Sequence, residues 1–82
     1  MVASPTVGRL YVMEVALSIK RWCICDLTLR PDETVFVDEQ PSPNRLIILT
    51  ESGGFHKVRR STFRMLVRVA TATDEARFAA AY

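Results

Sequence analysis

The sequence is poor in the residues that hold metals and carry redox chemistry. It has one histidine, His56, and two cysteines, Cys23 and Cys25. Two residues that are two positions apart on a strand share a face and lie about 7 Å apart, which suits neither a relaxed disulfide nor a C-x-x-C redox motif. A zinc site built on these cysteines would need two further ligands. We therefore predict no metal site, and we interpret both cysteines as small buried thiols.

Catalytic signatures are also missing. The chain has three glycines, and none belongs to a G-x-G-x-x-G or G-x-x-x-x-G-K phosphate loop. Ser61 and His56 are close in sequence, but residues 52–73 contain no acid that could orient the histidine. The adjacent acids Asp32-Glu33 and Asp38-Glu39 are expected in turns, where they face apart. These absences predict a protein that is not an enzyme and that has no cofactor.

No long hydrophobic run is present. The best apolar stretch, residues 10–19, is interrupted by Glu14 and is too short to span a bilayer. The N-terminus lacks the basic start and apolar core of a secretory signal. We therefore expect a cytoplasmic protein that does not enter a membrane. Its 82 residues correspond to one domain, with a flexible N-terminal leader at 1–8, a β-rich domain at 9–70 and a C-terminal helical tail at 71–82.

What the sequence does contain is regular alternation of apolar and polar residues, which predicts strands. A helix is an open alternative for the first alternating segment, because its apolar residues also fit a helical stripe. Residues 46–50 are apolar on both faces. They precede a glycine turn, and residues 55–60, which follow the turn, are rich in cations. The segments expected to form strands are 10–19, 22–30, 34–38, 46–50 and 55–60.

Turn signals between these segments set the expected pairing. Arg30-Pro31-Asp32-Glu33 favours a tight turn, which predicts a hairpin between the second and third strands. Residues 40–44 contain two prolines and are expected to form a loop, since neither proline could sit in a central strand. Ser52-Gly53-Gly54 predicts the hairpin turn between the last two strands, because glycine adopts positive φ without strain.

The segment after the last strand is ambiguous. Residues 62–70 fit a short helix capped by Ser61 or Thr62, and they fit a strand almost equally well. The predicted fold class is α+β, mainly antiparallel β. We expect a small curled sheet or open barrel of about five strands with one or two short C-terminal helices.

The C-terminal residues predict a terminal helix. Thr73-Asp74-Glu75 is a favourable start, because acids are stabilised near the positive end of the helix dipole. A helix this short is marginal alone in water, so it is expected either to dock through Phe78 and Tyr82 or to fray.

Charge is distributed unevenly along the chain. Residues 1–51 carry a net charge of −2, residues 52–73 carry +5, and residues 74–82 carry −1. A basic segment of this kind is typical of a protein that binds nucleic acid or an acidic protein surface, although a solvated edge is the simpler interpretation. Arginine presents a planar fork that suits phosphate and carboxylate. The candidate partner-binding residues are Lys57, Arg59, Arg60, Arg64 and Arg68.

Spacing refines this prediction. Residues four apart share a face on a helix and on a strand, so Arg60, Arg64 and Arg68 are expected to point the same way. Residues 55–61, FHKVRRS, resemble the F-x-R-V-H-R-S ending of LytTR DNA-binding domains. An arginine stands where that family has histidine, and a two-glycine turn replaces the helix expected before the motif. We therefore do not assign the family.

In general type, the chain resembles small phage-encoded regulators, which are short, catalytically blank, sheet-based and charge-segregated. This resemblance implies a non-enzymatic regulatory protein that binds a protein of a nucleic-acid machine through its basic 57–68 surface. We expect the transcription apparatus as the partner, through an acidic surface such as that of an RNA polymerase subunit. Direct binding of DNA or RNA by the same basic face is an open alternative. A further alternative is an oligomerising structural module that forms a homodimer.

Overall fold

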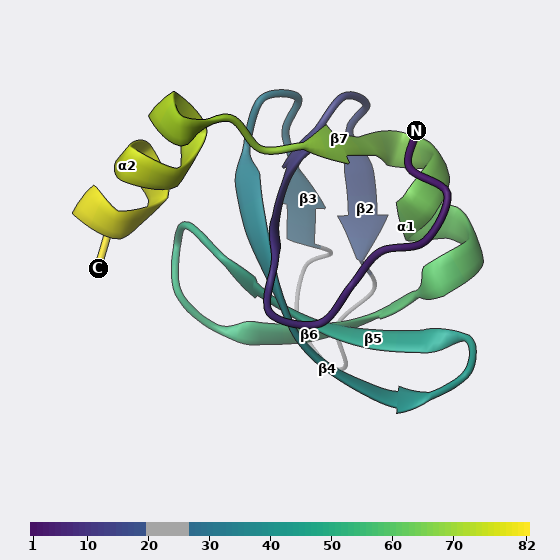
Figure 1. Cartoon of the computed structure of the whole chain (residues 1–82). Helices are drawn as coiled ribbons and strands as arrows, with labels where there is room; N and C mark the ends of the chain where they lie inside the picture. The colour runs from purple at the N-terminus through teal and green to yellow at the C-terminus, as the bar shows by residue number, and fades with distance from the viewer. Residues whose placement is uncertain (20–26) are drawn as a thin grey trace.

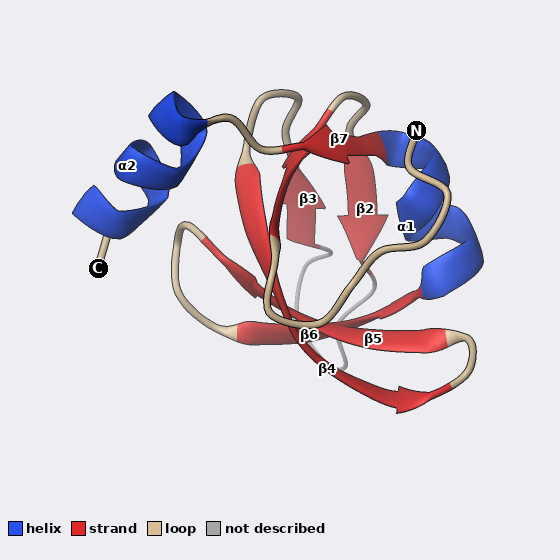
Figure 2. Ribbon diagram, in the orientation of Figure 1, coloured by secondary structure: helices blue, strands red, loops and turns tan. Residues whose placement is uncertain are grey.

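The structure is a computed structural model that describes residues 1–19 and 27–82 (Figures 1 and 2). The predicted α+β class is confirmed: the described strands pair antiparallel, in a five-stranded sheet that is not closed and a separate two-stranded sheet. Two helices lie near the C-terminal end. The elements are β1 Leu10–Met13, β2 Leu17–Ile19, β3 Leu27–Leu29, β4 Thr34–Ser42, β5 Arg45–Thr50, β6 Phe55–Arg59, α1 Arg60–Leu66, β7 Val67–Val69 and α2 Ala72–Ala80.

The larger sheet has the order β6-β5-β4-β1-β7. The strand β1 therefore lies between β4 and β7, with Tyr11 opposite both Val35 and Val69. The long strand β4 connects this part of the sheet to the β5–β6 hairpin (Figure 1). The core collects on the inner face of the curled sheet, where α1 contributes the fully buried Phe63. The ring of Phe63 meets Tyr11 edge to face, with 6.0 Å between ring centroids.

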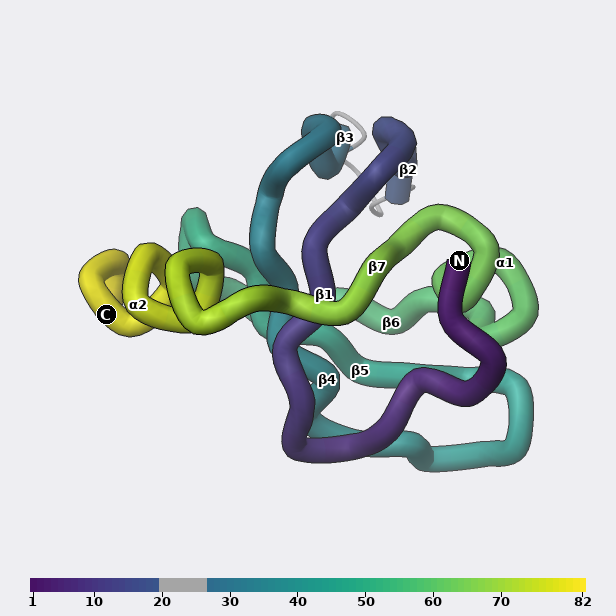
Figure 3. Tube along the Cα trace, turned by 45° about the horizontal axis from the view of Figure 1, so that its top comes forward, coloured from purple at the N-terminus to yellow at the C-terminus, as the bar shows by residue number. Residues whose placement is uncertain are grey.

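The predicted strand over residues 10–19 is two strands in the structure. The backbone N–H of Glu14 still donates to the carbonyl of Leu66 at 2.7 Å, in register with the β1–β7 pairing, and the chain bends after it. The chain then enters β2, which pairs with β3 and projects from the body (Figure 3). The alternating segment 10–19 is therefore divided between two sheets, with β1 in the five-stranded sheet and β2 in the two-stranded sheet.

The predicted hairpin between residues 22–30 and 34–38 is wrong in its described part. The strand β3 pairs with β2, whereas β4 pairs with β1 and β5. The turn at residues 30–33 is therefore a connection between two sheets. The expectations for Cys23, Cys25 and the rest of residues 20–26 fall outside the described residues.

The loop expected at residues 40–44 is shorter than predicted. The strand β4 continues through Pro41 to Ser42, and only Pro43 and Asn44 connect it to β5. The register with β1 ends at Phe36, and the register with β5 shifts twice beyond Val37. This end of β4 is thus bonded on one side only, and an irregular edge tolerates a proline that has no N–H to donate.

The glycine turn and the two strands around it form as predicted. Gly53 and Gly54 have φ values of 81° and 105°, and β5 pairs with β6 across the turn. Burial along β5 alternates, however: Leu46, Ile48 and Thr50 are buried, and the residues between them are only half-buried.

The ambiguous segment 62–70 contains both a helix and a strand. The helix α1 runs from Arg60 to Leu66, and β7 follows from Val67. The expected cap at Ser61 or Thr62 is wrong, since Arg59 occupies the N-cap position without a side-chain hydrogen bond. The helix ends where Val67 pairs with Met13 of β1, so sheet pairing decides the boundary.

The terminal helix α2 begins slightly earlier than the predicted start at Thr73-Asp74-Glu75. Thr71 is its N-cap, and Thr71 and Asp74 form a capping box. At the other end of the chain, the first residues lie beside α1, and the segment then runs to β4, where the N–H of Gly8 donates to the carbonyl of Val37 at 2.8 Å (Figures 1 and 3). The N–H of Val2 donates to the carbonyl of Arg64 at 2.8 Å, and Pro5 is buried. The flexibility of this leader stays a prediction.

Candidate partner-binding surface

The five predicted cations separate into three groups. Arg60 and Arg64 lie on α1 and bind the N-terminal segment. Arg60 donates from Nη2 to Ser4 Oγ at 2.7 Å, and Arg64 donates from Nε to the carbonyl of Ala3 at 3.3 Å. Both arginines are half-buried. Their guanidinium groups therefore already hold neutral oxygens of this chain.

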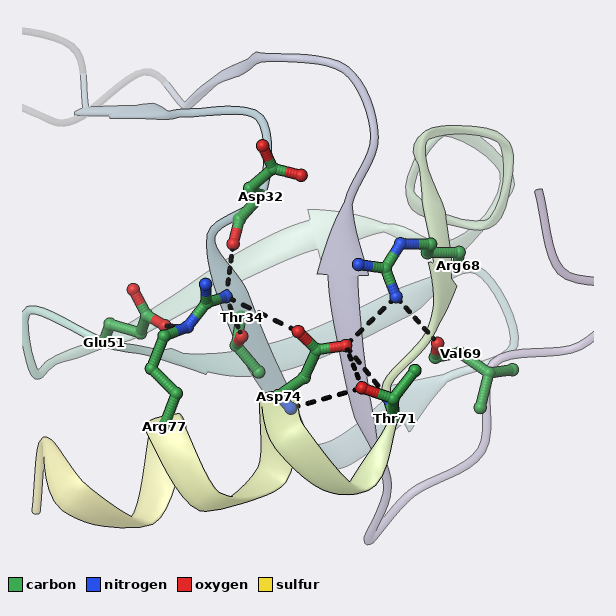
Figure 4. A network of polar contacts seen from close by, with 8 residues as sticks. All are labelled: Asp32, Thr34, Glu51, Arg68, Val69, Thr71, Asp74 and Arg77. Carbon is green, nitrogen blue, oxygen red and sulfur yellow. Dashed lines mark hydrogen bonds and ion pairs between the residues drawn. The ribbon is translucent and has the colours of Figure 1, made fainter.

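Arg68 does not share a face with these two arginines, so the predicted single cationic face is wrong. The reason is that α1 ends at Leu66 and places Arg68 on β7, opposite Val12 of β1. Arg68 forms an ion pair with Asp74 at 3.1 Å and also donates to the carbonyl of Val69 (Figure 4). It belongs to the contact that fixes α2 on the sheet.

Lys57 and Arg59 remain exposed. They alternate along β6 with the buried Val58, so they lie on the outer face of the sheet. Directly across from Arg59 on β5 is Arg45, which the sequence analysis did not select. The turn centred on Ser52 carried that signal, because folding the two strands back at this residue pairs position 45 with position 59. We call Arg45, Lys57 and Arg59 the cationic surface.

No acid within the described ranges neutralises the cationic surface. The ion pairs in this part of the chain join the N-terminal ammonium to Glu14, Arg68 to Asp74, and Arg77 to Glu51 and Asp74. Lys57 lies opposite Ile47, and Glu39 lies one strand further away. Like charges directly opposite each other destabilise a sheet. An external anion would relieve this repulsion.

An apolar row borders the cationic surface on the same outer face. Leu10 lies opposite Phe36, Phe36 opposite Leu49, and Leu49 opposite Phe55. The first three are half-buried, and Phe55 is 60% exposed. Directly opposite residues on neighbouring strands share a face. The row therefore crosses four strands and ends beside Lys57, giving a surface with an apolar half and a cationic half.

Lys57 and Arg59 also line a groove of about 390 Å³. It is lined by three consecutive residues of β2, by three consecutive residues of β6 and by one residue of α1. These are Leu17, Ser18, Ile19, Lys57, Val58, Arg59 and Thr62. This volume is near the lower end of the range of about 300–1,000 Å³ that is usual for ligand sites.

The helix α2 is held on the sheet mainly by polar contacts (Figure 4). Asp74, which is 8% exposed, accepts hydrogen bonds from the N–H and hydroxyl of Thr71, both at 2.9 Å. These bonds, with a smaller contribution from Arg68, lower the pKa of Asp74 to about 2.

Arg77 makes the second anchor of α2. It donates from Nη2 to Thr34 Oγ1 at 2.8 Å, and its Nε lies 3.3 Å from Glu51 Oε1. Tyr82 donates to the carbonyl of Thr50 and stacks against Phe78 at 5.0 Å. Docking through Phe78 and Tyr82 was one of two expectations, the other being fraying, and the role of Arg77 was not predicted. A single arginine in an alanine-rich helix gives no local signal for its partner.

The described residues offer no arrangement for metal chemistry: no cluster of three His, Cys, Asp or Glu side chains occurs among them. His56 is half-buried, on the same side of β6 as Val58. In the described ranges, no helix has the length and apolar character needed to cross a membrane.

Comparisons of this chain with protein-family models, with curated proteins and with solved structures found no match.

Proposed function

We propose that the protein is a non-enzymatic regulatory module that works by occupying an acidic surface of another protein. The partner is expected in a nucleic-acid machine, and the transcription apparatus, with RNA polymerase as the target, is the preferred candidate. We expect this to take place in the cytoplasm. The binding surface consists of Arg45, Lys57 and Arg59 together with the neighbouring apolar row.

The single observation that carries the proposal is the pairing of Arg45 with Arg59 across β5 and β6, where no acid of residues 1–19 or 27–82 forms an ion pair with either. Two guanidinium groups directly opposite each other on neighbouring strands destabilise a fold, so stability does not account for this pair. Carboxylates of a partner would supply the missing counter-charge, and two arginine forks can hold them with bidentate geometry.

The apolar row favours a protein partner over a purely ionic one. Protein interfaces are enriched in aromatic residues and arginine at their centre. Phe55 and Phe36 lie in the row, and Lys57 follows Phe55 by two positions on the same face of β6. Arg60, Arg64 and Arg68 already bind groups of this chain, so the proposal does not rest on them.

The test is binding of the full chain to purified bacterial RNA polymerase core enzyme, together with its effect on transcription in vitro. The double variant Arg45→Glu/Arg59→Glu should lose at least tenfold in affinity and lose its effect on transcription. The control is Arg30→Glu, which reverses the charge of an exposed residue that belongs to neither the cationic surface nor the apolar row. Equal loss in both variants, or no binding by the unmodified protein, would contradict the proposal.

A second candidate function is direct binding of single-stranded nucleic acid, and Phe55 is the observation that favours it. Its ring is 60% exposed on the same face of β6 as two cations, and exposed aromatic rings beside cations are how bases stack on sheet surfaces. Titration with a labelled oligothymidylate at two salt concentrations tests this. Micromolar binding that weakens steeply with salt, and that fails in Phe55→Ala, would establish it.

A further inference from the structure

We propose that the partner contributes an extended acidic segment, which binds in the groove between β2 and β6 by adding a strand to the open edge of β6. This inference rests on the proposed function, because it names the part of the acidic partner that is bound and the way in which it is held.

The lining of the groove identifies it as a space between strand edges. A strand that presents a face contributes every second residue, because successive side chains point to opposite sides. Here β6 contributes Lys57, Val58 and Arg59, and β2 contributes Leu17 to Ile19 without a gap. The strand β6 is at one end of the five-stranded sheet, and among the described residues β2 pairs with β3 alone. Within residues 1–19 and 27–82, the groove is therefore bounded by an unpaired strand edge on each side.

The backbone hydrogen bonds show which amides point into this groove. The N–H of Thr50 donates to the carbonyl of Gly54, and the N–H of Arg60 donates to the carbonyl of Asn44. Hydrogen-bonded pairs alternate along an antiparallel ladder. The same alternation makes His56 and Val58 bond to β5, so the N–H groups of Lys57 and Arg59 point away from β5.

The residues with outward amides are thus the residues with cationic side chains. A strand paired with β6 would receive hydrogen bonds from the N–H of Lys57 and of Arg59, and its side chains opposite these residues would meet an ammonium and a guanidinium. The side chains between them would face Val58. This alternation requires a segment in which every second residue is acidic and the residues between are apolar. Main-chain pairing supplies affinity and the alternate side chains supply selectivity in this mode of recognition.

The charge of the site excludes the reverse occupant. A basic segment would bring further cations to Lys57, Arg59 and the nearby Arg45. A charged edge strand normally protects a sheet against pairing with other chains. On β6 this protection acts against neutral and basic strands, whereas an acidic strand is attracted.

The experiment uses the full chain labelled with ¹⁵N and an eight-residue peptide of alternating glutamate and valine, with alternating lysine and valine as the control peptide. We expect the acidic peptide to bind and the control peptide not to bind. Binding should slow amide hydrogen exchange at Lys57 and Arg59 at least tenfold. Exchange at His56 and Val58 should change little, because β5 already protects these amides.

Two variants and two modified peptides complete the test. Lys57→Glu/Arg59→Glu should lose at least tenfold in peptide affinity, and Arg30→Glu should retain it. Two methylated peptides are compared, each with methyl groups on one of the two alternate sets of backbone nitrogens. Only one of them should lose binding, because only one set of peptide amides would face β6.

The outcomes separate this inference from the function on which it rests. Peptide binding that depends on Lys57 and Arg59 but leaves their amides unprotected would overturn strand addition and keep the acidic partner. The same conclusion follows if the peptide fails to bind while RNA polymerase binding depends on these two residues. Failure of both the peptide and the polymerase would overturn the inference together with the proposed function.

Discussion

Arg45 and Arg59 lie directly opposite each other on the neighbouring strands β5 and β6, and no acid of the described chain is paired with either. Their repulsion lowers the stability of the free protein. The same repulsion raises the benefit of binding an anion, because a partner that neutralises one guanidinium also relieves the other. Stability and binding therefore oppose each other at this pair.

The first prediction follows from this opposition. Arg45→Glu should stabilise the fold by roughly 0.2–1 kcal/mol, because an opposite-charge pair replaces a like-charge pair. Thermal unfolding should then show a Tm that is higher by up to a few degrees, with the gain shrinking as salt is added. Arg30→Glu, which changes the net charge equally, is the control. Equal Tm values for the two variants would show that the Arg45–Arg59 pair costs nothing.

Two phenylalanines provide a contrast in the second prediction. Phe63 is fully buried and Phe55 is 60% exposed. Phe63→Ala should cost about 3–5 kcal/mol of unfolding free energy, enough to unfold much of a domain this small. Phe55→Ala should leave the urea midpoint nearly unchanged and weaken partner binding instead. A large drop in stability for Phe55→Ala would place this ring in the core.

The third prediction concerns the turn between β5 and β6. Gly53 has φ of 81°, and a Cβ added there would meet no atom within 4 Å. Gly53→Ala should therefore destabilise the protein through backbone strain alone, by about 1–2 kcal/mol. Gly53→Asn should cost clearly less, because asparagine tolerates this conformation. Chemical denaturation of the three proteins measures both effects, and identical losses for alanine and asparagine would contradict the strain argument.

The fourth prediction is a pH dependence of α2. The pKa of Asp74 is lowered from 3.8 to about 2, first by the bonds from Thr71 and then by Arg68. A lowered folded-state pKa means that the stabilisation is present above the ordinary value and is lost as the pH falls from about 4 towards 2. Unfolding free energy of the unmodified protein should thus fall more steeply over this range than that of Asp74→Asn. Parallel curves for the two proteins would show that Asp74 does not stabilise the helix.

Local signals in the sequence were sufficient for part of the fold. The β5–β6 hairpin was predicted with its turn, because the glycines, the apolar run and the returning strand are adjacent in the chain. The terminal helix was predicted for a similar reason, with its start placed slightly too late. The sequence also selected Lys57 and Arg59, the two exposed cations of the cationic surface.

The remaining features depend on contacts between distant residues. The bend after Met13 leads the chain into β2, which pairs with β3, and the end of α1 depends on the pairing of Val67 with Met13. Neither interaction leaves a local signal. The prediction that Arg68 shares a face with Arg60 failed because it assumed a single regular element. Arg45 was not predicted because it lies outside the basic segment 52–73 and comes to lie opposite Arg59 only when the hairpin folds back.

The position of β1 between β4 and β7 determines the order in which the sheet can assemble. The strands β4, β5 and β6 are joined by short turns and can pair as soon as they emerge during synthesis. The strand β1 is made before the other described strands, yet one of its two neighbours, β7, is made after all of them. The contact between Tyr11 and Val69 closes a loop that contains most of the chain, and such non-local pairing slows folding. Until it forms, the nascent chain exposes one open edge of β1, which is the species most prone to aggregate.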